Sequence, residues 1–308
     1  MIVVAGESLI DLIVGADGRV DAIPGGGPYN VARTLGRLGR PVAFLGRLST
    51  DRFGTILRAG LATDGVDLSL APSTDAPTLL AVAELNAAGA ATYHFYDQGT
   101  AAPGLSVADI PDGLPATTSA LHVGTLGLVF EPIATTIETL VAGAPSDLLV
   151  MVDPNCRPTA IRDPAIYRAR LDRILGRADV VKVSLDDLAW LDPGTEPDDA
   201  AGRVLARGPA AVILTDGDRP VRLFTPTRVT EIPVPAVRVV DTVGAGDAFG
   251  AAFLAAWTGA GRGRTDLSDE VALVGPTRFA IEVGTRTTTR AGAEPPTLAE
   301  LEGVAGLW

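Results

Sequence analysis

Short runs of Val, Ile and Leu without polar alternation are the feature that most constrains the fold of this chain. They occur at residues 2–4, 148–152, 180–183 and 211–214. Strands that are buried on both faces, as in a parallel sheet, have this pattern. Between them, apolar residues spaced three and four positions apart predict helices over residues 30–38, 133–142, 165–175 and 200–206. The alternation predicts a doubly wound α/β fold, in which helices flank a mainly parallel sheet.

Two segments break this rhythm. Residues 10–23 and 78–96 have short alternating apolar patterns with turn residues between them, which predicts two hairpins. We expect the hairpins to pair as a small second sheet that forms a lid, built from insertions near residues 12–23 and 78–98. Since no repeat or long linker is visible, we expect residues 1–308 to form a single domain.

Composition excludes several functional classes. The 25 basic and 37 acidic residues give a formal net charge of −12, so we expect no basic surface for nucleic acid. Lys182 is the only lysine, and no Gly-Lys pair exists to end a phosphate-binding P-loop. The single cysteine, Cys156, can form no internal disulfide, which favours a reducing, cytoplasmic compartment. No stretch reaches the roughly 18 uncharged apolar residues that a membrane span requires.

The most specific motif is Asp-Thr-Val-Gly-Ala-Gly-Asp-Ala-Phe-Gly at residues 241–250, followed by an apolar helical stretch over residues 251–257. A Gly-Ala-Gly turn that opens a helix presents unpaired backbone N–H groups at the positive end of the helix dipole, which favours an anion. Asp247, in the first helical turn, could take a proton from an attacking hydroxyl while these N–H groups hold a transferring phosphoryl group. Two alternatives are a carboxylate that only stabilises the helix N-terminus and a dinucleotide-binding turn.

A second glycine-rich segment, Gly-Gly-Gly-Pro-Tyr-Asn at residues 25–30, opens the first expected helix. Glycine lets a backbone approach a ligand closely, and the Asn30 amide offers the donors and the acceptor that a sugar hydroxyl requires. The alternative is that Asn30 caps the helix. Asp11 follows the first strand, near the carboxyl edge at which ligands bind in open α/β sheets.

Together these segments resemble the ribokinase-like sugar kinases, also called the PfkB family, over almost the whole chain, and fructokinases are closest in motif. The resemblance implies a ribokinase-like fold and ATP-dependent phosphorylation of a sugar hydroxyl, with Asp247 as the catalytic base. It also implies an anion hole and a set of sugar contacts: Gly244, Ala245 and Gly246 for the anion, and Asp11, Gly26, Gly27 and Asn30 for the sugar.

Other positions are similar to the family pattern on the nucleotide side. Arg157, at the end of Asp-Pro-Asn-Cys-Arg, suits a phosphate near the phosphoryl path. Ser184 and Asp187 stand where the family has Asn-x-x-Glu, which positions Mg²⁺ and phosphates through water. The resemblance further assigns a Thr-x-Gly element to ATP and two backbone carbonyls to a monovalent cation such as K⁺: Thr215 and Gly217 for the nucleotide, Asp241 and Val243 for the ion.

Residues of the expected lid indicate which chemical class of acceptor the protein binds. Tyr96 could cover a sugar face, and packing in the core is the alternative. Asp97 stands where related keto-deoxygluconate kinases often carry arginine, so it would repel a carboxylate and could accept hydrogen bonds from sugar hydroxyls. We therefore expect a neutral sugar, with fructose first. A nucleoside or keto-deoxygluconate kinase, a non-catalytic sugar or nucleoside sensor, and a nicotinamide oxidoreductase are the alternatives, and a homodimer could form through the lid.

Overall fold

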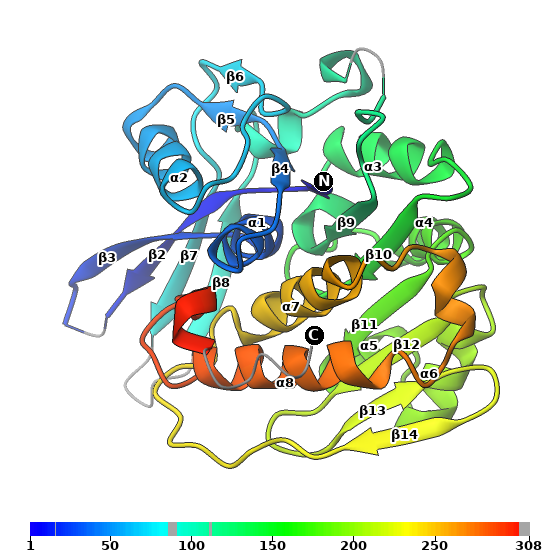
Figure 1. The fold of residues 1–308 in the computed structure, drawn as a ribbon. Coiled ribbons are helices and arrows are strands. Elements are labelled where there is room, and N and C mark those ends of the chain that lie inside the picture. The colour runs from blue at the N-terminus through cyan, green and yellow to red at the C-terminus, as the bar shows by residue number, and fades with distance from the viewer. Residues whose placement is uncertain (16, 86–90, 111–112, 302–308) are drawn as a thin grey trace.

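The protein is described by a computed structural model that places residues 1–15, 17–85, 91–110 and 113–301. Within these ranges an eight-stranded sheet has the order β14-β13-β12-β11-β10-β9-β1-β4 (Figure 1). Its strands are β1 (Ile2–Ala5), β4 (Val42–Leu45), β9 (Ala120–Gly124), β10 (Leu149–Asp153), β11 (Val180–Ser184), β12 (Ala211–Thr215), β13 (Val221–Phe224) and β14 (Val229–Ile232). The first six of these pair in parallel, and β13 and β14 are antiparallel.

Successive residues of the parallel strands enter two different apolar cores, which explains their unbroken hydrophobicity. Ile2 and Val4 pack into one core, and Val3 and Ala5 pack into the other. Helices cover both faces, as predicted for a doubly wound fold. One core includes residues of α1 (Gly27–Arg37), α2 (Arg52–Thr63), α7 (Ala245–Gly259) and α8 (Val274–Thr287), and the other includes residues of α3 (Ile133–Ala142), α4 (Pro164–Leu175), α5 (Leu185–Leu191) and α6 (Pro197–Leu205).

A separate four-stranded sheet has the order β3-β2-β7-β8, and it extends to one side of the main sheet in Figure 1. Its strands are β2 (Leu9–Val14), β3 (Val20–Gly25), β7 (Leu80–Leu85) and β8 (Ala91–Tyr96). Each expected hairpin supplies two strands, and β2 pairs with β7 in parallel, so the two hairpins join as the sequence predicts. Residues 16 and 86–90, between the strands of the hairpins, lie outside the described ranges. A lid function of this sheet stays a prediction.

The two glycine-rich segments begin helices, and α1 begins earlier than the apolar pattern indicates. Helix α1 begins at Gly27 with Pro28 in its first turn, a position at which proline is tolerated. Asn30 is therefore inside the helix, and its alternative role as the cap is wrong. Helix α7 begins at Ala245, so the Gly-Ala-Gly turn opens it as predicted, with Gly244 as its N-cap in the left-handed region at φ +75°.

The remaining elements are short. They are β5 (Leu48–Ser49), β6 (Ser73–Thr74) and five 3₁₀ turns: η1 (Ala102–Gly104), η2 (Val107–Asp109), η3 (Thr125–Leu128), η4 (Thr265–Ser268) and η5 (Leu298–Leu301). Of the helices in the described part of the chain, none combines the length and the apolar character needed to cross a membrane.

Candidate active site

The N-termini of α1 and α7 meet above the carboxyl ends of the parallel strands. Asp247 lies in the first turn of α7, as predicted, and Asn30 lies in the first turn of α1. The Asn30 side-chain Nδ2 donates a hydrogen bond of 2.8 Å to Oδ2 of Asp247, although 217 residues separate them. Both side chains are buried. The two motifs that the sequence analysis singled out therefore form one site.

The environment of Asp247 sets its protonation. Burial raises the pKa of this carboxyl above its ordinary value, and the Asn30 hydrogen bond, Lys182 and Arg157 oppose that rise. The Asn30 Oδ1 atom is also buried, and no donor in the described part of the chain reaches it. Since a buried amide oxygen is costly to leave unpaired, a ligand hydroxyl is the natural partner of this atom.

The backbone at residues 244–247, at the start of α7, is called the anion cradle below, because the sequence predicts an anion there. The Ala245 amide donates to the Thr242 carbonyl at 3.3 Å. The next two amides, of Gly246 and Asp247, donate to no acceptor within the described ranges. These N–H groups lie at the positive end of the helix dipole, which is the arrangement that binds phosphate in many proteins.

Glu7 is a residue of the site that the sequence analysis missed. Its carboxylate follows β1, is 1% exposed, and accepts from the amide of Gly27 at 3.2 Å and from that of Gly127 at 2.7 Å. The pKa of Glu7 is raised to about 7, mainly because the carboxyl is buried. The backbone hydrogen bonds oppose this rise, and the nearby charge of Asp247 adds to it. Glu7 thus fixes the start of α1. The only local signal was a carboxylate that directly follows a buried strand.

Asp11 lies on the face of the second sheet that turns toward Asp247 and Arg157. Burial raises its pKa to about 6, with Arg157 opposing and Asp247 adding to the rise. The strand register aligns Asp11 with Ala81 of β7, and Ala81 with Phe95 of β8. Residues aligned in this way share one face of a sheet. Asp11 and Phe95 therefore lie on the same face.

Tyr96 lies on the opposite face of the second sheet. It is aligned with Leu80, and its side chain is 62% exposed. The expectation that Tyr96 covers the sugar is wrong for this arrangement, because neighbouring residues of a strand point to opposite faces. Phe95, which packs edge-on against Phe130 at 6.1 Å between ring centroids, is the aromatic residue on the face of Asp11.

Arg157 follows β10 and is exposed, with Nη1 donating to the carbonyl oxygens of Asn155 and Cys156 at 3.2 Å each. Asn155 has a left-handed backbone at φ +40°, which turns the chain sharply after the strand. The Arg157 guanidinium acts electrostatically on both Asp11 and Asp247. This places its charge near the predicted phosphoryl path.

Ser184 and Asp187 form a capping box at the start of α5. The Ser184 Oγ accepts from the Asp187 amide, and Asp187 Oδ2 accepts from the Ser184 amide at 2.8 Å and from its Oγ at 2.6 Å. The Cys156 amide donates to the other oxygen, Oδ1, at 2.6 Å. Both carboxylate oxygens of Asp187 therefore have protein donors. Among the residues with described positions, no three His, Cys, Asp or Glu side chains form a metal-binding cluster.

Two further segments of the predicted nucleotide and cation sites are the turn after β12 and the loop before α7. Thr215 ends β12 and is followed by a turn in which Gly217 has φ +57°. Asp241 accepts from the amide of Val243 at 3.0 Å and from that of Gly292 at 2.8 Å, which joins the loop before α7 to the loop after α8. Within the described ranges the backbone carbonyls of Asp241 and Val243 accept no hydrogen bond, so they are free to coordinate a cation.

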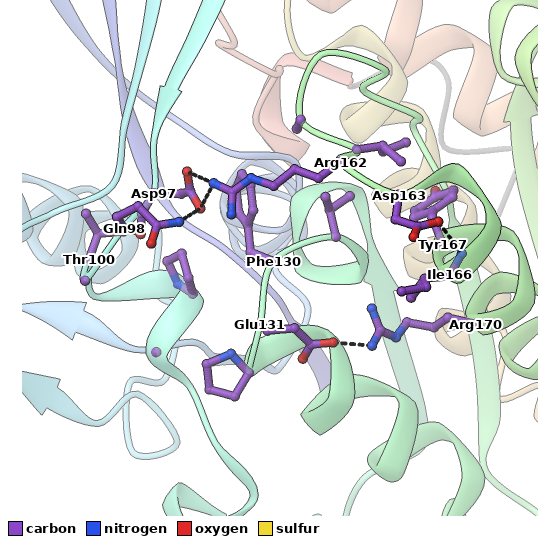
Figure 2. A pocket seen from close by; sticks show the side chains of 17 residues that line it. Asp97, Gln98, Thr100, Phe130, Glu131, Arg162, Asp163, Ile166, Tyr167 and Arg170 are labelled. Carbon is purple, nitrogen blue, oxygen red and sulfur yellow. Dashed lines mark hydrogen bonds and ion pairs between the residues drawn. The ribbon is translucent and has the colours of Figure 1, made fainter.

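A cavity of about 590 Å³ lies between the loop after β8, the loop before α3 and the start of α4 (Figure 2). At its edge the Arg162 Nη2 contacts both oxygens of Asp97, at 2.8 and 2.9 Å. Arg162 therefore takes up part of the acceptor capacity of Asp97, and a contact of this carboxylate with sugar hydroxyls stays a prediction. Neither Asp247 nor Asn30 lines this cavity.

Three comparisons with known proteins point to one family. The family model described as pfkB family carbohydrate kinase matches residues 1–297. A fructokinase of Rhizobium leguminosarum bv. trifolii is 38% identical over 260 residues, covering 83% of this chain and 79% of that protein. A fructokinase of Xylella fastidiosa, solved with bound ATP, has a TM-score of 0.90 at 28% identity, with 99% of this chain and 98% of that chain covered.

A second solved structure is a fructokinase double mutant of Vibrio cholerae O395 in a form with fructose, ADP and potassium ion bound. It has a TM-score of 0.87 at 25% identity, and the match covers 98% of this chain and 97% of that chain. The family model spans residues 1–297, which include the two glycine-rich helix starts that form the site, and the two structural matches cover 98–99% of the chain. The chain belongs to the pfkB family of carbohydrate kinases.

Proposed function

We propose that the protein transfers the γ-phosphoryl group of ATP to a hydroxyl of a neutral sugar, with fructose as the leading acceptor. The observation that carries this proposal is the buried contact between Asn30 and Asp247 beside the free amides of α7. The first turns of α1 and α7 then bring together a proton acceptor, a polar group for a hydroxyl and the anion cradle. Phosphoryl transfer to an alcohol needs all three.

The chemistry follows from these positions. Asp247 takes the proton of the sugar hydroxyl, whose oxygen bonds to the γ-phosphorus while the bond from that phosphorus to the bridging oxygen breaks and ADP leaves. The amides of Gly246 and Asp247 stabilise the charge on the transferring group, and Arg157 adds a positive charge nearby. Asn30 holds the sugar and orients Asp247, and Asp11 holds the sugar from the second sheet.

The second sheet takes the role of a lid in this proposal. Its Asp11 and Phe95 face the site, so its closure over the sugar would exclude water and favour transfer to the sugar over hydrolysis. The opposite face exposes Val20 and Tyr96, and a homodimer through this sheet is part of the same proposal. Sedimentation of the protein at two concentrations tests that dimer.

In this proposal the nucleotide and the ions bind at the segments around Thr215, Ser184 and Asp241. Thr215 and Gly217 would border ATP, and Mg²⁺ would bring charge neutralisation to its phosphates. Because protein donors occupy both Asp187 oxygens, Ser184 and Asp187 would reach the metal only through water. The free carbonyls of Asp241 and Val243 suit K⁺, as the potassium-bound form of the Vibrio cholerae relative supports.

The Asp97–Arg162 pair favours a neutral acceptor. An acidic acceptor needs an unpaired positive group, whereas the guanidinium of Arg162 is already bound to a carboxylate. We expect kcat/KM for fructose to exceed that for fructose phosphate or keto-deoxygluconate at least tenfold, which corresponds to about 1.4 kcal/mol in transition-state binding.

A coupled ADP-release assay tests the proposal with fructose, ribose, keto-deoxygluconate, adenosine and sugar phosphates as acceptors. ATP without acceptor is the background control. Fructose-dependent ADP release supports the proposal. A clear preference for adenosine or for an acidic acceptor refutes the neutral-sugar assignment, and sugar binding without any ADP release would indicate a sensor instead.

A further inference from the structure

The only lysine of the chain lies directly beneath the anion cradle. Lys182 is on β11, is buried, and its Nζ is 2.9 Å from Oδ2 of Asp153 on β10. A Cβ placed on Gly246 would lie 2.8 Å from this Nζ and 3.6 Å from Cε. The ammonium group is therefore packed against the α-carbon of the residue whose free amide forms the cradle.

Three carboxylates act on this ammonium group. Burial alone would lower the pKa of Lys182, but Asp153, Asp187 and Asp247 outweigh burial and raise it above its ordinary value. Lys182 is thus a permanent cation on the floor of the site. The neighbouring side chain on β9, His122, is buried and kept neutral because burial and Lys182 lower its pKa to about 3.

Fold stability alone does not explain why the ion pair of Lys182 and Asp153 is buried. A buried ion pair is often no more stabilising than apolar side chains of the same size, because desolvation offsets the attraction. A fixed charge beneath a phosphoryl site has a different use, since it stabilises negative charge that develops during transfer and needs no reorganisation.

We propose that Lys182 is a positioning residue of the phosphoryl site, whose buried ammonium offsets the surrounding carboxylates so that the cradle accepts the transferring phosphoryl group. The proposal rests on the proposed function, which places that group at residues 244–247. Without Lys182, the protein itself would offer a phosphoryl group in the cradle only backbone dipoles and Arg157 to balance Asp153, Asp187 and Asp247.

The test compares two variants that differ only at this position. Asp153→Asn keeps the ammonium group, and Asp153→Asn with Lys182→Met removes it without leaving a buried unpaired carboxylate. We expect the single variant to keep kcat within about fivefold of the wild type. We expect the double variant to lose about 100-fold or more in kcat, as when one group that stabilises a transition-state anion is removed, with the sugar KM changed less than about threefold.

A binding measurement separates this role from a structural one. Calorimetry with ADP and aluminium fluoride, an analogue of the transferring phosphoryl group, should show binding to the double variant weakened by at least about tenfold, with unchanged fructose binding and a similar melting temperature. A folded double variant with normal kcat and normal fluoride affinity overturns the proposal, and so does an equal loss in both variants. If the wild type phosphorylates no acceptor, the proposed function fails, and the fluoride affinities still measure the effect of Lys182 on the cradle.

Discussion

Replacing Asn30 by Leu removes the hydrogen bond to Asp247 and keeps a side chain of similar size. The bond is 2.8 Å long and lies between two buried groups, and a hydrogen bond to a charged group contributes about 1.5–3 kcal/mol. Because this bond lowers the pKa of Asp247, its loss raises that pKa further. The base is then protonated, and inactive, up to a higher pH.

The assay is the pH profile of kcat/KM for the sugar at saturating ATP. We expect the acidic limb of the profile to move to higher pH in Asn30→Leu. We also expect KM to rise, because the unpaired Oδ1 of Asn30 is lost as well. Thr34→Val is the matched control: its hydroxyl donates to the Asn30 carbonyl one turn along α1, and it makes no contact with Asp247. An acidic limb that stays within about 0.3 units of the wild type in Asn30→Leu refutes this account of Asp247.

Substitutions at Glu7 and Gly27 test the residues that position the start of α1 in the site. The folded-state pKa of Glu7 is raised from 4.5 to about 7, so the folded protein holds a proton that the unfolded chain has released, and this contribution to stability is lost as pH rises between these values. The free energy of unfolding, measured with urea, should fall between pH 5 and pH 8 by about 2–3 kcal/mol more in the wild type than in Glu7→Gln. The same fall in both proteins would contradict the raised pKa of Glu7. In Gly27→Ala the new Cβ would lie 2.3 Å from Oγ1 of Thr125 and 3.3 Å from Oδ1 of Asp247, so kcat/KM should fall by at least tenfold. Gly202→Ala in α6, where a Cβ meets no atom within 4 Å, is its control and should be active and more stable by up to about 1 kcal/mol; equal activity of the two variants would show that the space at Gly27 does not matter.

The layers of the fold could be predicted because each strand and helix carries its own local pattern. The runs at residues 2–4 and 180–183 show no polar alternation, and apart from Lys182 they are apolar, since both faces of those strands are buried. The start of α1 was harder to predict, because glycine and proline have low helix propensity and hide the first turn. The antiparallel strands β13 and β14 were not predicted, as they are short and lie at the edge of the sheet.

The site could be predicted only in part for a related reason. Its two glycine-rich motifs are local in sequence, whereas the contacts that complete it join residues far apart. Lys182 meets Gly246, and Glu7 binds the amides of Gly27 and Gly127, with no sign of either contact in the sequence pattern. The choice between neighbouring residues of one strand, such as Phe95 and Tyr96, depends on the register with β7, which the sequence does not determine.

The central claim is that Asp247 is the base of an ATP-dependent sugar kinase, and Asp247→Asn tests it most directly. The change keeps the size of the side chain and its place in the first turn of α7, but removes the proton acceptor. Phosphorylation of fructose by ATP should slow by about 10² to 10⁴, the range found when a general base is lost, while calorimetry shows fructose still binding. Phosphorylation by Asp247→Asn at the wild-type rate would contradict the account.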